Sequence, residues 1–324
     1  MKSIQDKINF IKWQLEARIF GGSIYQRVRN SLINKNILDS DPFYYIYWLD
    51  LNKSLLSKYL FGTFGTSNED YVKFINWLNE RYAKEDIYEI EINKFLIKIP
   101  KPLIEDYKCF KAEFLDIIMP YLVQNIDMVQ PFLEGPYEYG KVKIREGDTV
   151  LDLGANYGLF SSLAASRNCE VYAFEPTERV IKYYLSYLER LYPNVFVINK
   201  AVSNVTGTSW FKVYDNKSSC NSLQDNFINL ENMVKVDTIS VDDFVSCNNL
   251  NRVDFIKADI EGAERKMLDG AKYTLKEYAP NLAICYYHKL DDLKVLRKKI
   301  LEANPNYEID IAYKKIYAKV PGRD

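Results

Sequence analysis

The stretch from Val150 to Gly158, VLDLGANYG, constrains the fold more than any other part of the chain. Its first residues predict an apolar strand, and the apolar residues that follow Gly158 recur at helical spacing. A strand, a glycine-bearing turn and a helix form the repeating unit of open α/β sheets. Because glycine has no Cβ and tolerates positive φ, such a turn lets a ligand approach free backbone N–H groups closely. The stretch therefore predicts a ligand site at the end of a buried strand.

The spacing of the glycines indicates which ligand. They stand as Asp-x-Gly-x-x-x-Gly, whereas a dinucleotide-binding turn has Gly-x-Gly-x-x-Gly. The acidic residue at the strand end, Asp152, suits a cationic ligand better than a pyrophosphate. We therefore predict S-adenosylmethionine, which carries an ammonium and a sulfonium charge, as the cofactor. A dehydrogenase that binds NAD is the weaker alternative.

Composition narrows the partners and the compartment. The 324 residues carry a formal net charge of -1 with no basic block, which argues against nucleic acid held by phosphate contacts. The five cysteines have neither a CxxC pair nor metal-ligand spacing, and they are expected to be reduced thiols. The chain has no apolar run near the ~20 residues that span a bilayer, and no signal-peptide core. We expect a cytoplasmic protein without a transmembrane segment.

Residues 1–130 are predicted to be mainly helical, with a β-hairpin near residues 88–99 that turns at Asn93. The first helix is amphipathic, so it could dock on its own domain, pair with a second subunit to form a homo-oligomer, or lie on a membrane surface. Helical spacing is found over four ranges: 4–19, 42–61, 71–82 and 110–123.

From residue 131 onward, strands alternate with helical stretches, which predicts a mostly parallel, Rossmann-like sheet closed by an antiparallel pair. The parallel strands are expected at 149–153, 170–174, 195–199, 253–257 and 282–286, and the closing pair at 307–313 and 315–320. Two further strands are predicted at 209–214 and 234–239, with a polar loop at 215–226. A helix is predicted over 180–191.

Charged side chains follow several of these strands. Ligands of an open parallel sheet bind outside the carboxyl ends of its strands. Glu175 follows the second strand, about twenty residues after the glycine turn, where a carboxylate can accept both ribose hydroxyls. Asp259 and Glu261 follow the fourth strand, and the chain's single histidine, His288, follows the fifth. Glu264, in the first turn of the next helix, is expected to interact with the helix dipole.

The segment from Asp254 to Ala271, DFIKADIEGAERKMLDGA, resembles the FkbM family of S-adenosylmethionine-dependent methyltransferases. VLDLGANYG, together with AFEP after the second strand, is similar to the cofactor elements of that family. NKAVSN at 199–204, TISVDDF at 238–244 and YYHKLDDL at 286–293 agree as well, and the resemblance extends over roughly residues 134–320. It implies a class I methyltransferase domain over residues 131–324, preceded by the mainly helical region.

The resemblance also implies roles for particular residues. Matching positions would line the methionine and adenosine portions of the cofactor, hold its ribose, and surround the acceptor. The first set is Asp152, Gly154, Ala155, Asn156 and Gly158; the second is Glu175 with Pro176; the third is His288, Asp259 and Glu261. Asp259 could also contact the amino group of the cofactor.

Methyl transfer to oxygen is an in-line displacement at carbon, so a base that takes the hydroxyl proton helps. His288 is the first choice, because a histidine titrates near neutral pH. The alternative is a divalent metal, Mg²⁺ or Mn²⁺, held by Asp259, Glu261 and His288, which would lower the pKa of the hydroxyl.

The family usually O-methylates a sugar or a natural product, so we predict transfer to a hydroxyl of a sugar or glycan building block. A non-sugar acceptor, such as a lipid, peptide or polyketide, stays open, as does a catalytically silent cofactor-fold module that binds a partner. The loops at 131–139 and 215–226 are candidates for acceptor binding or for a lid.

Overall fold

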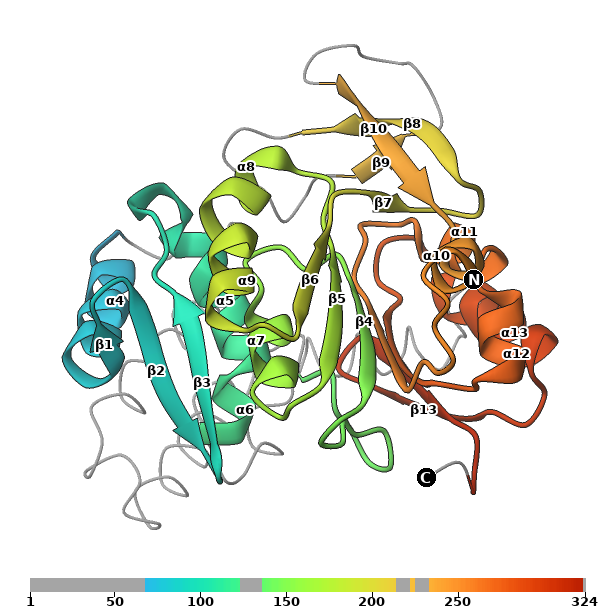
Figure 1. Cartoon of the computed structure of the whole chain (residues 1–324), viewed down its shortest axis with the longest axis horizontal. Helices are drawn as coiled ribbons and strands as arrows, with labels where there is room; N and C mark the ends of the chain where they lie inside the picture. Colours follow the sequence, from blue (N-terminus) through green and yellow to red (C-terminus); the bar gives the residue numbers. More distant parts are fainter. Residues whose placement is uncertain (1–67, 123–135, 214–221, 225–232, 323–324) are drawn as a thin grey trace, which may run out of the picture. The chain divides into compact units, whose positions relative to one another are not determined.

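The computed structural model describes residues 68–122, 136–213, 222–224 and 233–322 (Figure 1). The helices predicted over 4–19 and 42–61 lie outside these residues. The chain divides into two compact units, the first comprising Met1–Ala83 and Asp127–Phe132 and the second comprising Lys84–Ile126 and Leu133–Asp324. The described part of the first unit is mainly the helix α4 (Asn68–Tyr82), which confirms the helix predicted over 71–82. Within the described ranges, no helix has the length and apolar character to span a bilayer.

The second unit is built on a seven-stranded sheet in the order β13-β14-β12-β11-β4-β5-β6. Five neighbouring strands, from β6 to β12, run parallel, and β14 is antiparallel to both β12 and β13. The predicted parallel sheet with an antiparallel closing pair is therefore confirmed, with strand ends shifted by one or two residues. The strands are β4 (Thr149–Leu153), β5 (Glu170–Phe174), β6 (Val195–Ile198), β11 (Phe255–Ala258), β12 (Asn281–Cys285), β13 (Glu308–Ala312) and β14 (Lys315–Lys319).

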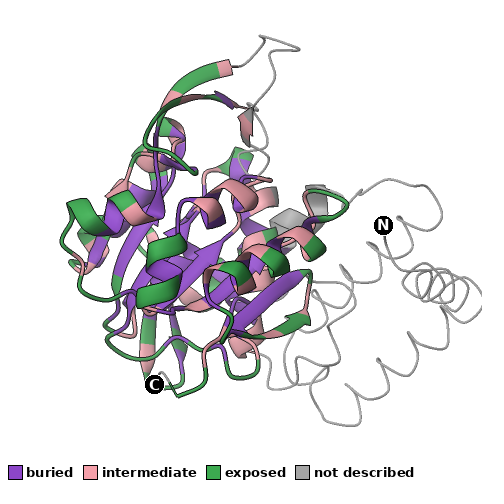
Figure 2. Ribbon diagram, turned by 90° about the vertical axis from the view of Figure 1, so that its right-hand side faces the viewer, coloured by how far each residue is buried: buried purple, intermediate pink, exposed green. Residues whose placement is uncertain are grey.

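Helices cover both faces of this sheet (Figure 1). One face carries α5 (Tyr107–Ile117), α7 (Leu159–Ala165) and α9 (Ser186–Leu191), and the other carries α10 (Val241–Cys247), α11 (Glu264–Asp269), α12 (Lys272–Glu277) and α13 (Asp292–Ala303). The central strands β4 and β11 are buried from both sides, and Figure 2 shows the buried residues in purple. Successive strand residues point to opposite faces. Accordingly, Ile256 joins the core under α10 to α13, whereas the ring of Phe255 lies 5.8 Å from that of Phe160 in α7.

The helix predicted over 180–191 consists of three pieces: α8 (Glu178–Val180), a π-helical turn η3 (Ile181–Leu185), and α9. The π turn carries Tyr184, which is buried and packs edge-on against Tyr157 with 4.8 Å between ring centroids. Its hydroxyl donates to Asp106 Oδ2 at 2.5 Å. Single π turns inside helices often mark functional sites, and this one links the helix after β5 to the chain before the sheet.

The elements before the sheet belong to the same unit. After β1 (Ala83–Lys84), the predicted hairpin is present as β2 (Ile87–Ile92) and β3 (Phe95–Pro100), with Asn93 at φ 56°. η1 (Ile104–Asp106) leads into α5, and the single helix predicted over 110–123 is instead α5 followed by α6 (Met119–Leu122). Val123 lies outside the described residues.

Hydrogen bonds fasten this leading segment to the helices after β5. The backbone N–H of Lys98 donates to the Tyr192 hydroxyl at 2.6 Å, and that of Leu103 donates to the Tyr184 hydroxyl at 3.0 Å. These residues accordingly lie in one compact unit, which begins at Lys84.

A smaller sheet has the order β7-β10-β8-β9. Its strands are β7 (Ala201–Val202), β8 (Gly207–Lys212), β9 (Ser222–Gln224) and β10 (Met233–Ile239). The strands predicted near 209–214 and 234–239 pair antiparallel, as β8 and β10. The stretch predicted as a polar loop, 215–226, contains β9, because Leu223 pairs with Phe211 of β8. The rest of that loop lies outside the described residues.

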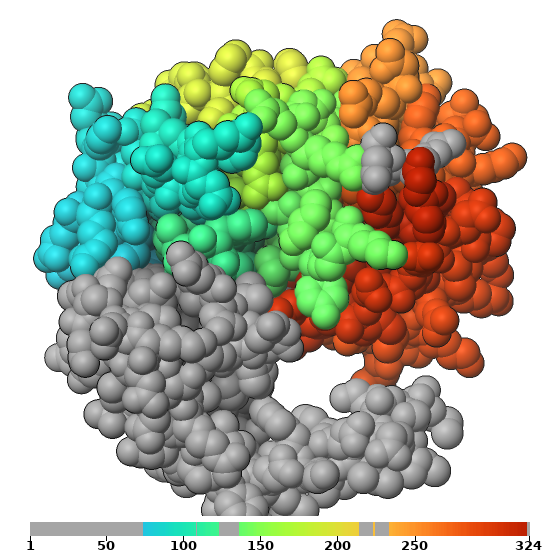
Figure 3. Space-filling model, turned by 90° about the horizontal axis from the view of Figure 1, so that it is seen from below, coloured from blue at the N-terminus to red at the C-terminus, as the bar shows by residue number. Residues whose placement is uncertain are grey.

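The segment that leads into β4 lies against the C-terminal strands. Figure 3 shows this face, with the segment in green beside the strands in red. The Tyr317 hydroxyl donates to the carbonyl oxygen of Pro136 at 2.5 Å, and the ring of Tyr139 lies 5.2 Å from that of Tyr317. These contacts fix the position of the intervening Tyr137, which is buried.

The closest backbone approach in the sheet gives the first testable prediction. Gly154 has φ +80°, and a Cβ there would lie 2.1 Å from the carbonyl oxygen of Asp259. Gly154→Ala should lower the free energy of unfolding by roughly 2 kcal/mol or more, since it adds left-handed strain to a backbone clash. Gly207→Ala, where a Cβ meets nothing within 4 Å, is the control. Equilibrium urea unfolding measures the free energy of unfolding of both variants. Equal losses in the two variants would contradict the tight backbone contact at Gly154.

Candidate active site

The glycine turn after β4 has the left-handed conformations that its sequence requires. Gly154, Asn156 and Gly158 have φ values of 80°, 43° and 78°. The N–H groups of Gly154 and Ala155 both donate to the carbonyl oxygen of Phe174, at 3.0 and 2.9 Å. The turn is therefore held across the carboxyl ends of β4 and β5, as predicted from the strand-turn-helix pattern.

Glu175 lies at the end of β5 and reaches back to this turn. Its Oε2 accepts the N–H of Asn156 at 3.2 Å, and its Oε1 accepts the N–H of Thr177 at 2.9 Å. Burial raises the pKa of Glu175, and the hydrogen bonds from Thr177 and Asn156 oppose that rise. The side chain of Thr177 also hydrogen-bonds to this carboxylate, whose two oxygens together offer about four lone-pair sites. A fixed acceptor pair therefore stands next to the turn, and Pro176 follows it.

Asp152 is fully buried and already paired. Its Oδ1 lies 3.0 Å from Lys257 Nζ, and its Oδ2 accepts a hydrogen bond from Ser161 Oγ at 2.6 Å. Burial opposes the charge on Lys257, but Asp152 and Asp259 outweigh it and raise the lysine pKa. The two charges of this ion pair sit opposite each other in the register of β4 and β11. The charge of Asp152 is thus balanced within the protein, which was not expected from the sequence.

Asp259 is surrounded by donors and cations. The Tyr137 hydroxyl donates to its Oδ2 at 2.8 Å, and the Tyr287 hydroxyl donates to its Oδ1 at 3.2 Å. Burial would raise the pKa of Asp259, but Lys257, His288 and Lys315 lower it overall. The side chain is therefore a carboxylate at neutral pH, held by tyrosines from β12's end and from the loop predicted at 131–139.

His288 lies among three carboxylates. Its Nδ1 is 3.2 Å from Glu264 Oε1, and its Nε2 is 3.3 Å from Glu261 Oε2 and 3.6 Å from Asp259 Oδ1. Burial opposes the positive charge, yet the hydrogen bonds and charges of these acids raise the pKa of His288 to about 11. The expected titration near neutral pH is wrong for this environment. The side chain is an imidazolium at pH 7.

Glu261 is held in an unusual backbone conformation. It has φ 53°, and Gly262 after it has φ 94°. A glutamate in the left-handed region is strained, and such residues gather at functional sites. Burial raises the pKa of Glu261, against the hydrogen bond to His288. The tight turn aims this carboxylate back toward His288.

Glu264 does more than interact with the helix dipole. It is 1% exposed, and its Oε1 accepts the N–H of Ile260 at 2.9 Å besides facing His288. One ligand atom from each of Asp259, Glu264 and His288 lies within 4.8 Å of the others, which is close enough for a metal ion. This set contains Glu264, where the sequence-based metal alternative had Glu261.

Two site residues were not expected from the sequence, although each had a signal. The first is Lys257, a charged residue in the otherwise apolar strand β11, where it stands opposite the predicted site residue Asp152 of β4. The second is Tyr137, which belongs to the loop at 131–139, a predicted candidate for acceptor binding. Which strands pair and where a loop packs cannot be predicted from one segment of the chain. The positions of Lys257 and Tyr137 near Asp259 are therefore known only from the folded structure.

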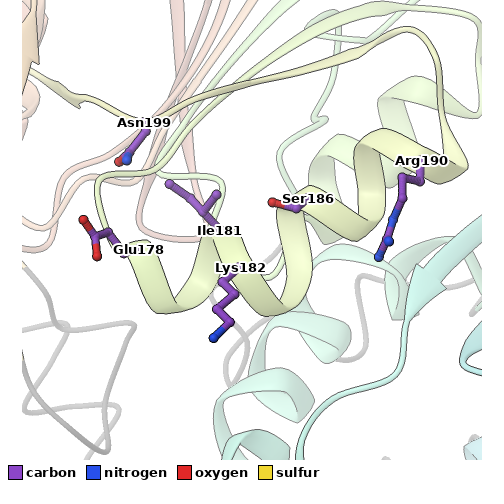
Figure 4. Close-up of a pocket in the computed structure, with 6 residues that line it drawn as sticks. All are labelled: Glu178, Ile181, Lys182, Ser186, Arg190 and Asn199. Atoms are coloured by element: carbon purple, nitrogen blue, oxygen red, sulfur yellow. The ribbon is translucent and has the colours of Figure 1, made fainter.

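A shallow hollow of about 600 Å³ lies elsewhere, on the outer side of α8, η3 and α9 (Figure 4). None of the predicted site residues lines it. The side chains around it are Glu178, Ile181, Lys182, Ser186, Arg190 and Asn199.

The sheet order, the glycine turn and the strand-end carboxylates define a Rossmann-like methyltransferase. Residues 152–308 match the family model described as the methyltransferase FkbM domain, and the chain is a methyltransferase that contains this domain.

Three known proteins illustrate the similarity. The hexuronic acid methyltransferase AglP of Haloferax volcanii is 25% identical over 216 residues, which are 65% of this chain and 84% of AglP. The crystal structure of the methyltransferase FkbM from Methylobacillus flagellatus KT is 21% identical and has a TM-score of 0.45; the match covers 78% of this chain and 60% of that one. Fibrillarin of Aeropyrum pernix, solved with S-adenosyl-L-methionine, is 16% identical with a TM-score of 0.35, covering 55% of this chain and 68% of fibrillarin.

The buried ion pair gives a prediction on stability. Lys257→Met leaves the Asp152 charge buried without its partner, so the free energy of unfolding should fall by about 3–5 kcal/mol. Adding Asp152→Asn should recover much of the loss, because the stranded charge is removed while the Ser161 bond is kept. Lys298→Met, which breaks an exposed pair with Glu302, should cost about 0.5 kcal/mol or less. Urea unfolding of the wild type, the two single variants and the double variant tests this prediction. If Lys257→Met lowers the free energy of unfolding no more than Lys298→Met does, the prediction is wrong.

Proposed function

We propose that the chain transfers a methyl group from S-adenosylmethionine to a hydroxyl of a sugar or glycan building block. The observation that carries this proposal is the adjacency of two groups of residues at the carboxyl ends of the parallel strands. The glycine turn with Glu175 forms one, and the cluster of Asp259, Glu261 and His288 forms the other. The name of AglP supports a sugar as acceptor, and carboxylates suit the binding of several hydroxyls.

The residues of the turn fit the proposed cofactor. Gly154 lets the turn pass close to the carbonyl oxygen of Asp259, and among the described residues no hydrogen-bond donor reaches the buried Oδ1 of the Asn156 side chain. Glu175 is placed to accept ribose hydroxyls, while Asp152, Ala155, Gly158 and Pro176 shape the turn around it. When bound, S-adenosylmethionine supplies an electrophilic methyl group on a positively charged sulfur.

On the acceptor side, the roles of the three predicted residues change. An imidazolium cannot take a proton, so His288 is a positioning residue that holds Glu261 and Asp259. We propose that Glu261 accepts the hydroxyl proton, because its pKa is raised and a stronger base removes a proton more readily. Asp259, whose pKa is lowered, orients the acceptor or the cofactor amino group.

A divalent cation is the second candidate for activating the hydroxyl. The convergence of Asp259, Glu264 and His288 supports it, since oxygen ligands with one imidazole suit Mg²⁺ or Mn²⁺. These residues would hold the ion, with His288 giving up its proton so that a ring nitrogen can bind the metal, and Glu261 would face the acceptor beside it. Turnover that is lost with EDTA and restored by Mg²⁺ or Mn²⁺ would favour this alternative over the metal-free scheme.

Acceptor class, location and assembly remain part of the proposal. A hydroxyl of a lipid, peptide or polyketide is the alternative acceptor. A catalytically silent module that binds a partner is the alternative function. Cys169 and Cys247 are free thiols, which suits a reducing cytoplasm. Pairing through the first helix would make a homo-oligomer.

Calorimetric titration tests the cofactor, and an acceptor panel tests the reaction. We expect micromolar binding of S-adenosylmethionine and S-adenosylhomocysteine but none of NAD. We further expect S-adenosylhomocysteine to form with hexuronic acids and glycan precursors and not with lipids or peptides. Binding without turnover on any acceptor would favour the silent module, and turnover on lipids or peptides alone would replace the sugar.

The proposed base gives a separate prediction. Glu261→Gln should lower turnover about 10²-fold or more, because the amide cannot take the hydroxyl proton. Affinity for S-adenosylmethionine should stay within about twofold, since the change touches the acceptor side. Glu302→Gln, an exposed glutamate on α13, is the matched control and should retain full turnover. Wild-type turnover in Glu261→Gln would remove it as the proton acceptor.

A further inference from the structure

The proposed cofactor carries a cationic ammonium group, and the structure raises the question of which carboxylate receives it. Asp152 is balanced by Lys257, and Asp259 faces both Lys257 and the imidazolium of His288. Asp152 and Asp259 are therefore each engaged by neighbouring groups, and Glu175, the third carboxylate near the turn, accepts two backbone N–H groups. An additional acid is needed to complement an ammonium group there.

Glu113 is such an acid, and it comes from α5, outside residues 152–308 that match the family model. Its Oε1 accepts a hydrogen bond from Nδ2 of Asn156, the central residue of the glycine turn. Its charge interacts with those of Lys257, Asp152 and Asp259, so it lies in the same crevice. In the described parts of the chain, its hydrogen-bond partner is an amide and not a cation.

α5 is held over the turn by contacts on its own flank. Asp106, directly before α5, accepts hydrogen bonds from the Tyr184 hydroxyl at 2.5 Å and from Arg179 at 2.8 Å. The ring of Phe110 lies 6.3 Å from that of Tyr157, which precedes Gly158. α5 also packs on α7 (Figure 1). Glu113 is thus presented to the turn by a fastened helix.

The local chemistry at Asn156 leaves an opening for a donor. Its Nδ2 donates to Glu113, while its Oδ1 is buried and accepts no hydrogen bond from the residues that the structure describes. A buried acceptor without a donor costs free energy. An ammonium group has three N–H donors and no acceptor, so it can bond to both Asn156 Oδ1 and a Glu113 oxygen. Burial raises the pKa of Glu113, and a neighbouring cation would restore its charged form.

We propose that Glu113 and Asn156 together bind the α-ammonium group of the cofactor, so that the segment before the family domain completes its cofactor site. This inference rests on the proposed function, because it takes S-adenosylmethionine as the ligand. It adds a residue that the glycine-turn motif does not contain.

Calorimetry with three ligands tests the assignment. S-adenosylmethionine and S-adenosylhomocysteine both carry the ammonium, only the former carries the sulfonium, and methylthioadenosine lacks the whole amino-acid portion. Glu113→Gln should weaken both ammonium-bearing ligands about tenfold or more, which corresponds to a lost charge-assisted hydrogen bond. Its affinity for methylthioadenosine should stay within about twofold of the wild type, which also reports that the site is folded.

Glu105→Gln is the matched control. Glu105 lies in η1 just before α5, and its exposed carboxylate pairs with Arg179, so the variant removes the same charge away from Asn156. All three affinities should then be unchanged. Equal weakening of all three ligands by Glu113→Gln, weakening of S-adenosylmethionine alone, or no weakening would each overturn the assignment to the ammonium. Failure of the wild type to bind S-adenosylmethionine would instead contradict the proposed function.

Discussion

The ion pair between Asp152 and Lys257 is the interaction on which the rest of the site depends. Both side chains come from the centre of the sheet, and both are shielded from water. Desolvating a single charge there would cost several kcal/mol, so each residue is tolerable only because the other stands opposite it. The Nζ of Lys257 also donates to the carbonyl oxygen of Gly154, which ties the pair to the glycine turn. The register of β4 and β11 therefore positions the turn as well as the charges.

Two groups of carboxylates with different electrostatic surroundings interact with this pair. Glu113 and Glu175 form the first group, next to the glycine turn. Asp259, Glu261 and Glu264 form the second group and surround the imidazolium of His288. Each group has carboxylates in excess of cations, which suits a cationic donor and an acceptor rich in hydroxyl groups. The protonated histidine prevents the second group from becoming a bare acidic cluster.

Much of the fold could be predicted from the chain because its signals are local. The alternation of strands and helices after residue 131, the hairpin at Asn93 and the antiparallel closing pair all follow from hydrophobic period and turn residues. Predictions failed where partners decide the outcome. The helix over 180–191 contains a π turn because Tyr184 packs on Tyr157 and bonds to Asp106, and β9 forms because β8 offers it an edge.

The sequence by itself determined that a glycine turn with a strand-end acid lies beside Glu175, and that Asp259, Glu261 and His288 follow neighbouring strands. These conclusions need only the rule that parallel strands end at one edge. Tertiary structure alone decided the charge states. Three carboxylates converge on His288 and make it an imidazolium, while Lys257 neutralises Asp152 and Glu113 arrives from a preceding helix. A pKa depends on the distances between charges that are remote in the chain, and only the folded protein sets those distances.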